Sequence, residues 1–184
     1  MAFCDSDIFF LKPFDVRNGS RDKQIRFSSI EVPQKSDHKL ILNSIDLMGL
    51  LPSKVKRCAY DDPFVTWHRP TAIAMQDYLT KLHNRPWHEA IGSKLMFSEF
   101  ALYIMFVSYI QKSNPFHYED NTILCKTLWD KEAAKKTDIA AFCSGLAPEQ
   151  VAVCIQSLLG IDVGLLNQQL NSAMLRHQQT SQNE

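Results

Sequence analysis

The stretch that decides the fold lies at the amino end, where residues 1–11 read Met-Ala-Phe-Cys-Asp-Ser-Asp-Ile-Phe-Phe-Leu. Its aromatic and apolar residues predict a β-strand, and two aspartates interrupt that strand. A pair of carboxylates inside such a strand is costly unless a metal ion or hydrogen bonds satisfy them. Asp5 and Asp7 are therefore the first residues for which we expect a functional role.

The chain beyond this stretch alternates between strand and helix patterns. Pro13 ends the first strand, and Arg-Asn-Gly-Ser at residues 17–20 predicts a turn into a second strand at 24–32. Short apolar runs predict two further strands, at 64–67 and 151–155. Apolar residues at helical spacing predict helices at 36–49, 70–83, 87–95, 98–111, 131–145 and 163–177.

The order of these elements indicates the fold class. Strands separated by helices, with no internal repeat and no linker, predict an α/β fold and a single domain over residues 1–177. The last residues, 178–184, are polar and are expected to form a disordered tail. With 184 residues, of which 45% are hydrophobic, the chain can bury a core of its own.

The charge balance limits the classes of partner. Twenty basic and twenty acidic residues give a formal net charge of zero. Such a chain has no long-range field that attracts nucleic acid or an anionic membrane. We therefore expect no nucleic-acid partner.

Cysteine usage and hydrophobic run length bear on location. The five cysteines are odd in number and never form a Cys-x-x-Cys pair, which argues against a disulfide framework and a zinc knuckle. The longest apolar run, residues 100–107, is far shorter than the roughly 18 to 20 residues of a membrane span. No export signal is recognisable. The expectation is a cytoplasmic protein with reduced thiols and without a transmembrane segment.

The Asp-x-Asp motif predicts a metal site. Two carboxylates with one residue between them can hold Mn²⁺ or Mg²⁺ when the phosphates of a ligand complete the shell. In a transferase, the ion would neutralise a diphosphate leaving group as the sugar–phosphate bond breaks. The alternative is that Asp5 and Asp7 only decorate a turn, as this short tripeptide frequently does.

Residues 3–15 resemble the metal-binding segment of glycosyltransferases with the GT-A fold. The chain as a whole resembles an uncharacterised bacterial family of GT-A-like proteins, through pieces at 10–14, 47–50, 65–69, 85–87, 97–103 and 151–157. The resemblance implies transfer of a sugar from a nucleotide-diphosphate donor to a hydroxyl acceptor with Mn²⁺ or Mg²⁺. A role in surface-polysaccharide synthesis would fit this family.

One departure from that family concerns the nucleotide-binding half. GT-A proteins carry βαβ units before the aspartate motif, and nothing here corresponds to them. Each unit takes roughly 30 residues or more, so on the order of 60 to 100 residues would be absent. We expect an incomplete GT-A-like fold that lacks its N-terminal half or works as an oligomer.

Glu99 is the candidate catalytic base. It follows Ser98, which can cap the free amides of the next helix, and it stands where the helix dipole favours an anion. In the GT-A-like interpretation it faces the cleft and accepts a proton from the acceptor hydroxyl, or orients that hydroxyl. The alternative is a purely structural partner of the helix dipole.

Histidine, aromatic and arginine side chains complete the predicted site. His68, at a strand end, and His117, in a predicted loop, are candidate metal ligands because GT-A-like enzymes often add a late histidine to the metal shell. His68 could instead be a polar tip at the cleft, and His117 could be a solvated loop residue. The candidate substrate-binding residues are the aromatic side chains Trp67, Trp87 and Tyr103, which could stack on a sugar or belong to the core, and Arg69, which could meet phosphate.

Two further functions stay open. Phosphatases of the haloacid dehalogenase type also use Asp-x-Asp after an apolar strand, but they expect Thr or Val where this chain has Phe9. A non-catalytic, truncated relative that binds glycan or protein is the other possibility. The first of these two is the weaker, because the motif departs from the phosphatase pattern.

Overall fold

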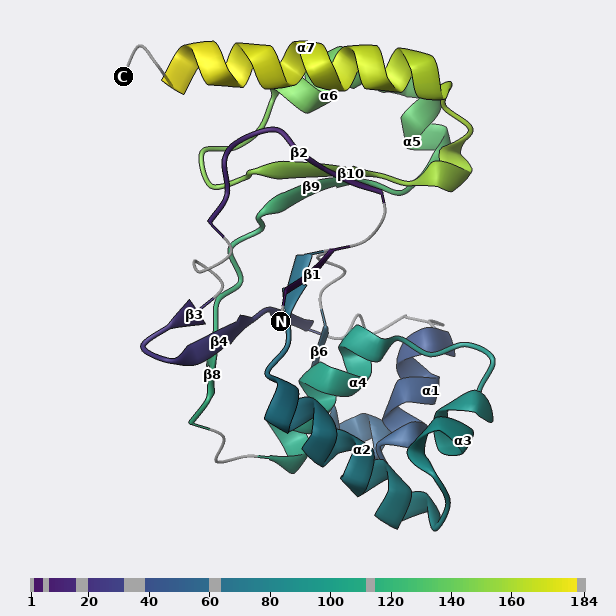
Figure 1. Ribbon diagram of the computed structural model, residues 1–184. Helices are drawn as coiled ribbons and strands as arrows, with labels where there is room; N and C mark the ends of the chain where they lie inside the picture. Colours follow the sequence, from purple (N-terminus) through teal and green to yellow (C-terminus); the bar gives the residue numbers. More distant parts are fainter. Residues whose placement is uncertain are drawn as a thin grey trace. The chain divides into compact units, whose positions relative to one another are not determined.

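The computed structural model describes residues 2–4, 7–15, 20–31, 39–59, 64–111 and 115–181 (Figure 1). The chain divides into two compact units. The first unit comprises Met1–Ala2, Gly19–Asp61 and Val65–Asn121, and the second comprises Phe3–Asn18, Asp62–Phe64 and Thr122–Glu184. Two strands, β1 (Ala2–Cys4) and β7 (Phe64–Thr66), contain residues of both units. The single domain over 1–177 stays a prediction, because two compact units can belong to one domain or to two.

Helices dominate the first unit. They are α1 (Lys39–Leu47), the short 3₁₀ turn η2 (Pro52–Lys54), α2 (Arg69–His83), α3 (Trp87–Gly92), α4 (Glu99–Met105) and its π-helical continuation η3 (Phe106–Ile110). The helical spacing of apolar residues thus predicted the α-helices of this unit in the correct places. Their ends differ from the predicted ends by a few residues, as is usual.

The end of α1 is closed by a left-handed residue and by side chains of α2. Gly49 has φ +63°, and its N–H donates to Asp46 O at 2.9 Å. Tyr78 Oη donates to Met48 O at 2.9 Å, and His83 Nε2 lies 2.8 Å from Leu47 O. The carbonyl groups that a helix end leaves without partners are therefore satisfied by α2.

The helix at 98–111 is buried as its apolar sequence predicted. Ser98 Oγ accepts the N–H of Ala101 at 3.2 Å, which confirms the predicted cap. The helix changes to the wider π form at Phe106. This places Tyr109 Oη where it accepts the N–H groups of Lys56 and Arg57, at 2.9 and 2.8 Å, so the helix also fixes the start of strand β6 (Arg57–Ala59).

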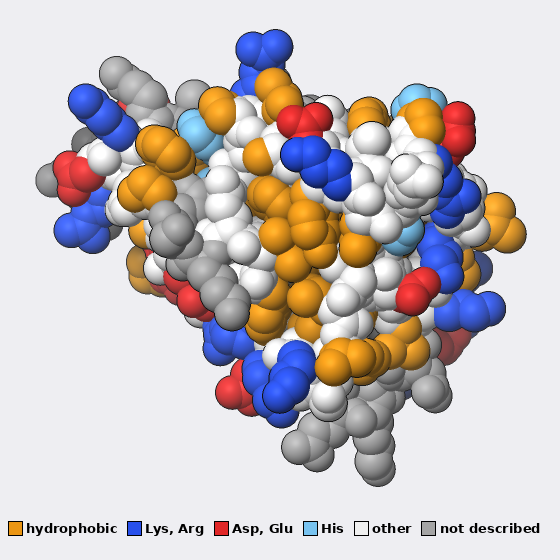
Figure 2. Space-filling model, turned by 90° about the horizontal axis from the view of Figure 1, so that it is seen from below, with side chains coloured by type: hydrophobic (Ala, Val, Ile, Leu, Met, Phe, Trp, Pro, Cys, Tyr) orange, Lys and Arg blue, Asp and Glu red, His pale blue; other side chains and the backbone are white. Residues whose placement is uncertain are grey.

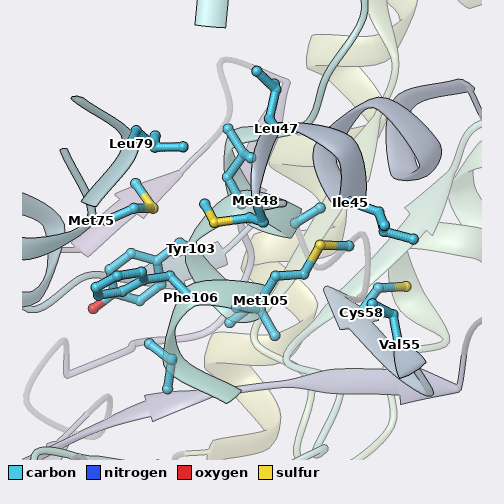
Figure 3. Close-up of a cluster of buried hydrophobic side chains, with 14 residues drawn as sticks. Ile45, Leu47, Met48, Val55, Cys58, Met75, Leu79, Tyr103, Met105 and Phe106 are labelled. Atoms are coloured by element: carbon cyan, nitrogen blue, oxygen red, sulfur yellow. The ribbon is translucent and has the colours of Figure 1, made fainter. Parts of the chain in front are cut away.

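The core of the first unit is made by helices that surround α4. Figure 3 shows side chains from α1, α2, β6 and α4 pointing toward one another. Tyr103, Met105 and Leu79 expose 0% of their surface. The fully apolar stretch of α4 is therefore the centre of this core.

Small sheets complete the first unit. Their strands are β3 (Ser20–Arg21), β4 (Gln24–Phe27), β5 (Ser29–Glu31), β6 (Arg57–Ala59) and β8 (His117–Glu119). Strand β4 pairs antiparallel with β3 and parallel with β8, and β5 pairs antiparallel with β6. The tight turn lies at Asp22 and Lys23, which have φ 50° and 67°, as in the type I′ turns typical of hairpins. The predicted turn at 17–20 falls largely outside the described residues.

The second unit is built on a three-stranded sheet. Its strands are β2 (Ile8–Phe10), β9 (Cys125–Leu128) and β10 (Ala152–Ile155), in the order β2-β10-β9. The central strand β10 is buried throughout, antiparallel to β2 and parallel to β9. This agrees with the strand predicted at 151–155.

Helices α5 (Lys131–Lys136), α6 (Ile139–Ser144) and α7 (Val163–Ser181) follow the strands of the second unit (Figure 1). The single helix predicted at 131–145 is wrong, because Thr137 is extended and Asp138 caps a new helix by accepting the N–H of Ala140 at 2.9 Å. Helix α7 continues to Ser181, inside the segment predicted as a tail. That segment contains no glycine or proline that would end a helix earlier.

The architecture is mixed α/β, as predicted at the level of fold class. Figure 2 shows one face on which hydrophobic side chains gather near the middle and acidic and basic side chains are interspersed around them. None of the described helices combines the length and the apolar character that a bilayer span requires.

Candidate functional site

Asp7 lies in the second unit, at the end of the central strand. Its main-chain oxygen accepts the N–H of Ile155 at 3.1 Å, and its Oδ2 accepts the N–H of Ser157 at 3.0 Å. Because β2 runs antiparallel to β10, the residue just before β2 must lie beside the last residue of β10. The half-buried carboxylate thus faces the first turn of η4 (Ser157–Leu159), the 3₁₀ segment that follows β10.

This position is the carboxyl edge of a parallel strand pair. Strands β9 and β10 run in the same direction, and Gln156 N donates to Leu128 O at 3.3 Å just beyond them. Ligands of α/β sheets bind outside the carboxyl ends of parallel strands. Asp7 therefore lies at the edge of its sheet where a ligand is expected. Asp5, the other member of the motif, lies outside the described residues.

The donor set at this edge fits a divalent ion only in part. A carboxylate has about four lone-pair positions, and the described bond from Ser157 uses one of them. Mg²⁺ is commonly held by one or two carboxylates together with substrate phosphates and water. Within the described ranges, no three His, Cys, Asp or Glu side chains gather as a metal site. Asp7 could therefore contribute one carboxylate to an ion site at this edge.

A second arrangement, in the first unit, is the histidine–aromatic cluster. It consists of Trp67, His68, Thr71, Tyr103, Phe116 and His117. Tyr103 Oη stands at its centre, accepts the main-chain N–H of His68 at 2.8 Å and lies 2.7 Å from His117 Nε2. His68 Nδ1 lies 3.0 Å from Thr71 Oγ1. The hydroxyl of one core tyrosine therefore joins α4, β8 and the start of α2.

The rings of the cluster pack closely. Trp67 stacks on Tyr103 with ring centroids 5.1 Å apart and planes 4° from parallel. His68 stacks on Phe116 at 4.9 Å and meets His117 edge-on at 5.9 Å. Each stack adds to the stability gained from area burial alone. The cluster is therefore a closely packed set of rings.

Burial keeps Tyr103 and His117 uncharged at neutral pH. It raises the pKa of Tyr103 to about 12, against the opposite effect of hydrogen bonds from the His68 N–H and from Thr71. Burial, together with the charge that His68 can carry, lowers the pKa of His117 to about 4. Both shifts have the sign expected when the charged form loses solvation.

A polar network holds the strands near this cluster. The Glu119 carboxylate accepts Ser29 Oγ at 2.7 Å and Arg57 Nη2 at 2.9 Å. Burial would raise the pKa of Glu119, but hydrogen bonds from Ser29 and Asn121 and the Arg57 charge outweigh it and lower that pKa. Because these groups satisfy one another and tie β5, β6 and β8 together, we interpret the network as structural.

The structure brings together four of the predicted site residues. Trp67, His68, Tyr103 and His117 meet in the cluster. The loop position expected for His117 is wrong. This residue lies in strand β8, where it pairs with Ile25 of β4, and it exposes only 8% of its surface. Tyr103 exposes 0% of its surface, so its ring stacks on Trp67 and offers no face to a sugar.

The other predicted residues of the first unit lie on helix surfaces. Glu99 is exposed in the first turn of α4, and Arg69 is exposed as the first residue of α2. Trp87 is 37% exposed in α3 and meets His88 edge-on at 5.7 Å. The metal, base and substrate-binding roles of these residues stay predictions.

Sequence reasoning missed Thr71, Phe116 and Ser157. His68 is the N-cap of α2, and Thr71 is the third residue of that helix. Side chains at these two positions commonly contact each other at a helix start. That signal was readable from the sequence. The contacts of Phe116 and Ser157 depend on residues far away in the chain and had no local signal.

A search of the curated proteins and a search of the solved structures found no match to this sequence. Over residues 2–177, however, the chain matches the family described as a family of unknown function (DUF6492), and it therefore belongs to that family.

Proposed function

We propose that this chain acts as a glycosyltransferase that uses a nucleotide-diphosphate sugar and Mn²⁺ or Mg²⁺. The observation that carries this proposal is the position of Asp7 at the carboxyl edge of β9 and β10, with Oδ2 accepting the Ser157 N–H. A half-buried carboxylate at this edge could coordinate a divalent cation that also binds the phosphates of a ligand.

In this proposal Asp7, with Asp5, would hold the ion, which would neutralise the diphosphate leaving group. The bond from the Ser157 N–H orients the Asp7 carboxylate before the ligand arrives. Such preorganisation lowers the cost of gathering charge at the site.

The test is calorimetric titration of uridine and guanosine diphosphate sugars with Mn²⁺ into the wild-type chain and into Asp7→Asn. Asparagine can still accept the Ser157 N–H, so this change removes charge and preserves the local hydrogen bond. We expect affinity to fall by about 100-fold or more, because losing even an outer partner of a metal ligand costs about 10- to 100-fold.

Asp162→Asn is the matched control. Asp162 belongs to the same unit, and its Oδ1 accepts the N–H of Leu165 at 2.8 Å at the start of α7, a bond that asparagine can also accept. This variant should bind as the wild type does. Metal-independent binding of a glycan by both variants would favour the non-catalytic alternative, and equal binding of the nucleotide sugar by wild type and Asp7→Asn would refute the proposal.

A further inference from the structure

Trp129 stands directly after strand β9 of the second unit, and its main chain is held on both sides. Leu128, the residue before it, is buried at 6% exposure. Asp130, the residue after it, caps α5 by accepting the N–H of Ala133 at 2.6 Å. The position of Trp129 at the end of β9 is therefore fixed by a strand and by a helix cap.

The end of β9 belongs to the same edge of the sheet as Asp7. Ile155, at the end of β10, pairs with Leu128 on one side, and its N–H donates to Asp7 O at 3.1 Å on the other. Neighbouring strands lie roughly 4.8 Å apart, so the main chains at Asp7 and Trp129 stand roughly 10 Å apart across β10. Two adjoining parts of one small ligand can therefore contact both residues.

The side chains at this edge leave apolar surface exposed. Trp129 is 40% exposed, and within the described part of the chain its ring neither stacks on another ring nor bonds through its indole N–H. Leu158, which follows the Ser157 that bonds to Asp7, is 78% exposed. The edge thus combines a carboxylate with an available aromatic face, and such a face has an apolar body and a polar N–H.

We propose that Trp129 is the platform on which the sugar ring of the nucleotide-diphosphate donor stacks. This assignment rests on the proposed function, in which Asp7 holds the ion that binds the donor's phosphates. The sugar is joined directly to the diphosphate, so its ring lies next to that ion. The C–H groups of one sugar face pack on the flat indole, while the hydroxyl groups stay free for hydrogen bonds.

The placement of the tryptophans favours Trp129 for this role. The chain has three tryptophans, and Trp129 is the one that shares the second unit with Asp7. Trp67 and Trp87, which the sequence suggested as platforms, belong to the first unit, and Trp67 already stacks on Tyr103.

Calorimetric titration with Mn²⁺ tests the platform in wild type, Trp129→Ala and Trp129→Phe. The probes are uridine diphosphate glucose, guanosine diphosphate mannose and the two nucleoside diphosphates without sugar. We expect Trp129→Ala to bind the nucleotide sugars about 10-fold more weakly, the size of one good aromatic contact, and Trp129→Phe to retain most of the affinity. The nucleoside diphosphates should bind all three proteins equally. Leu175→Ala, which changes an exposed side chain of the same unit, should bind as the wild type does.

Tryptophan fluorescence gives a second measurement. The change in emission that a nucleotide sugar causes in the wild type should be absent in Trp129→Phe, although this variant still binds. Free glucose or mannose at millimolar concentration should cause the same change without Mn²⁺. Trp129 is partly exposed and lies outside any helix or strand, so both variants should fold.

Asp7→Asn distinguishes this assignment from the proposed function. If Asp7→Asn weakens binding and Trp129→Ala does not, the metal site stands and the platform is refuted. If Trp129→Ala weakens binding of the nucleotide sugars and Asp7→Asn does not, the platform stands and the metal-dependent function is refuted. An equal loss for the nucleoside diphosphates in Trp129→Ala would mean that the base stacks on the ring, which would overturn the sugar assignment.

Discussion

The Asp7 site of the second unit and the histidine–aromatic cluster of the first unit treat charge in opposite ways. The second unit places the Asp7 carboxylate at the end of a strand pair, where it accepts the main-chain N–H of Ser157. The first unit places His117 and Tyr103 inside packed rings, where burial keeps both uncharged. The difference shows that charge is kept where water or a ligand can solvate it and is suppressed where neither can.

The hydrophobic cores of the two units consist of separate sets of side chains. The core of the first unit consists of helix side chains around α4, including Leu102 at 1% exposure. The core of the second unit lies between β10 and the helices α6 and α7, with Ile155 at 2% exposure. Each unit therefore has a buried cluster of its own.

Truncation of a core side chain should give the largest change in the free energy of unfolding. Leu102→Ala in the first unit and Ile155→Ala in the second should each lower the free energy of unfolding by about 2 to 5 kcal/mol, because each removes buried methyl groups and leaves a cavity. Urea denaturation measures the loss. Hydrogen exchange of backbone amides then locates it, and protection should fall most in the unit that carries the change.

The exposed substitution Leu175→Ala is the control. Leu175 lies on α7 with 56% exposure, so its truncation should change stability by less than about 1 kcal/mol. Equal loss of protection in both units, for either core variant, would mean that the two cores unfold together as one cooperative body.

Acid gives the next largest effect, and it should act on the first unit through His117. The pKa of this residue falls from 6.5 to about 4 on folding, so between these values the unfolded chain binds a proton that the folded chain does not. The contribution of neutral His117 to the free energy of unfolding is fully present above about pH 6.5. It is lost as pH falls toward 4, and the loss is at most about 3 kcal/mol. Urea denaturation at a series of pH values measures this slope.

His117→Gln isolates that contribution. The Glu119 carboxylate, whose pKa is lowered, also loses its stabilising bonds in acid, but at pH values below those at which His117 begins to act. The variant should therefore keep the steep acid loss and lack the slope just below pH 6.5. A variant whose profile equals that of the wild type would show that His117 does not control this window.

Elements with strong local signals were predictable from the sequence. Helix α2 has proline in its first turn and a regular apolar stripe, and β10 is a continuous apolar run, so both were found. Strand β9 was missed because Lys126 stands in it. The structure shows that Lys126 Nζ reaches the carbonyls of Phe142 and Gly145, at 3.0 and 2.9 Å, which removes the cost of placing this lysine in a strand.

The candidate sites divide in the same way. Asp7 drew attention through a local feature, a carboxylate in an apolar stretch, but the strand predicted there is divided into β1 and β2, and Asp7 lies in a turn just before β2, so its metal role stays a prediction. The burial of His117 was not predictable, because its loop-like neighbours gave no sign that β4 would pair with it. Pairing between residues 25 and 117 is long-range information that composition and periodicity do not contain.

Glycine substitutions give the smallest effect and compare two left-handed positions, one in each unit. Gly49 and Gly160 have φ +63° and +72°, conformations that cost an alanine roughly 1 to 2 kcal/mol. A Cβ at Gly49 would also lie 3.1 Å from Leu82 Cδ2, whereas at Gly160 it would meet nothing within 4 Å. We expect Gly49→Ala to destabilise more than Gly160→Ala, by a few tenths of a kcal/mol, in urea denaturation.

The additional cost of Gly49→Ala over Gly160→Ala should be small because the Leu82 side chain can move. Leu82 is 43% exposed, so its side chain can rotate away from a new methyl group without opening a cavity. The double variant Gly49→Ala/Leu82→Ala removes the contact and should bring the cost of the glycine change down to that of Gly160→Ala. If the cost at Gly49 stays higher without Leu82, the difference between the two units must come from the α1 terminus itself, where Gly49 N–H bonds to Asp46 O.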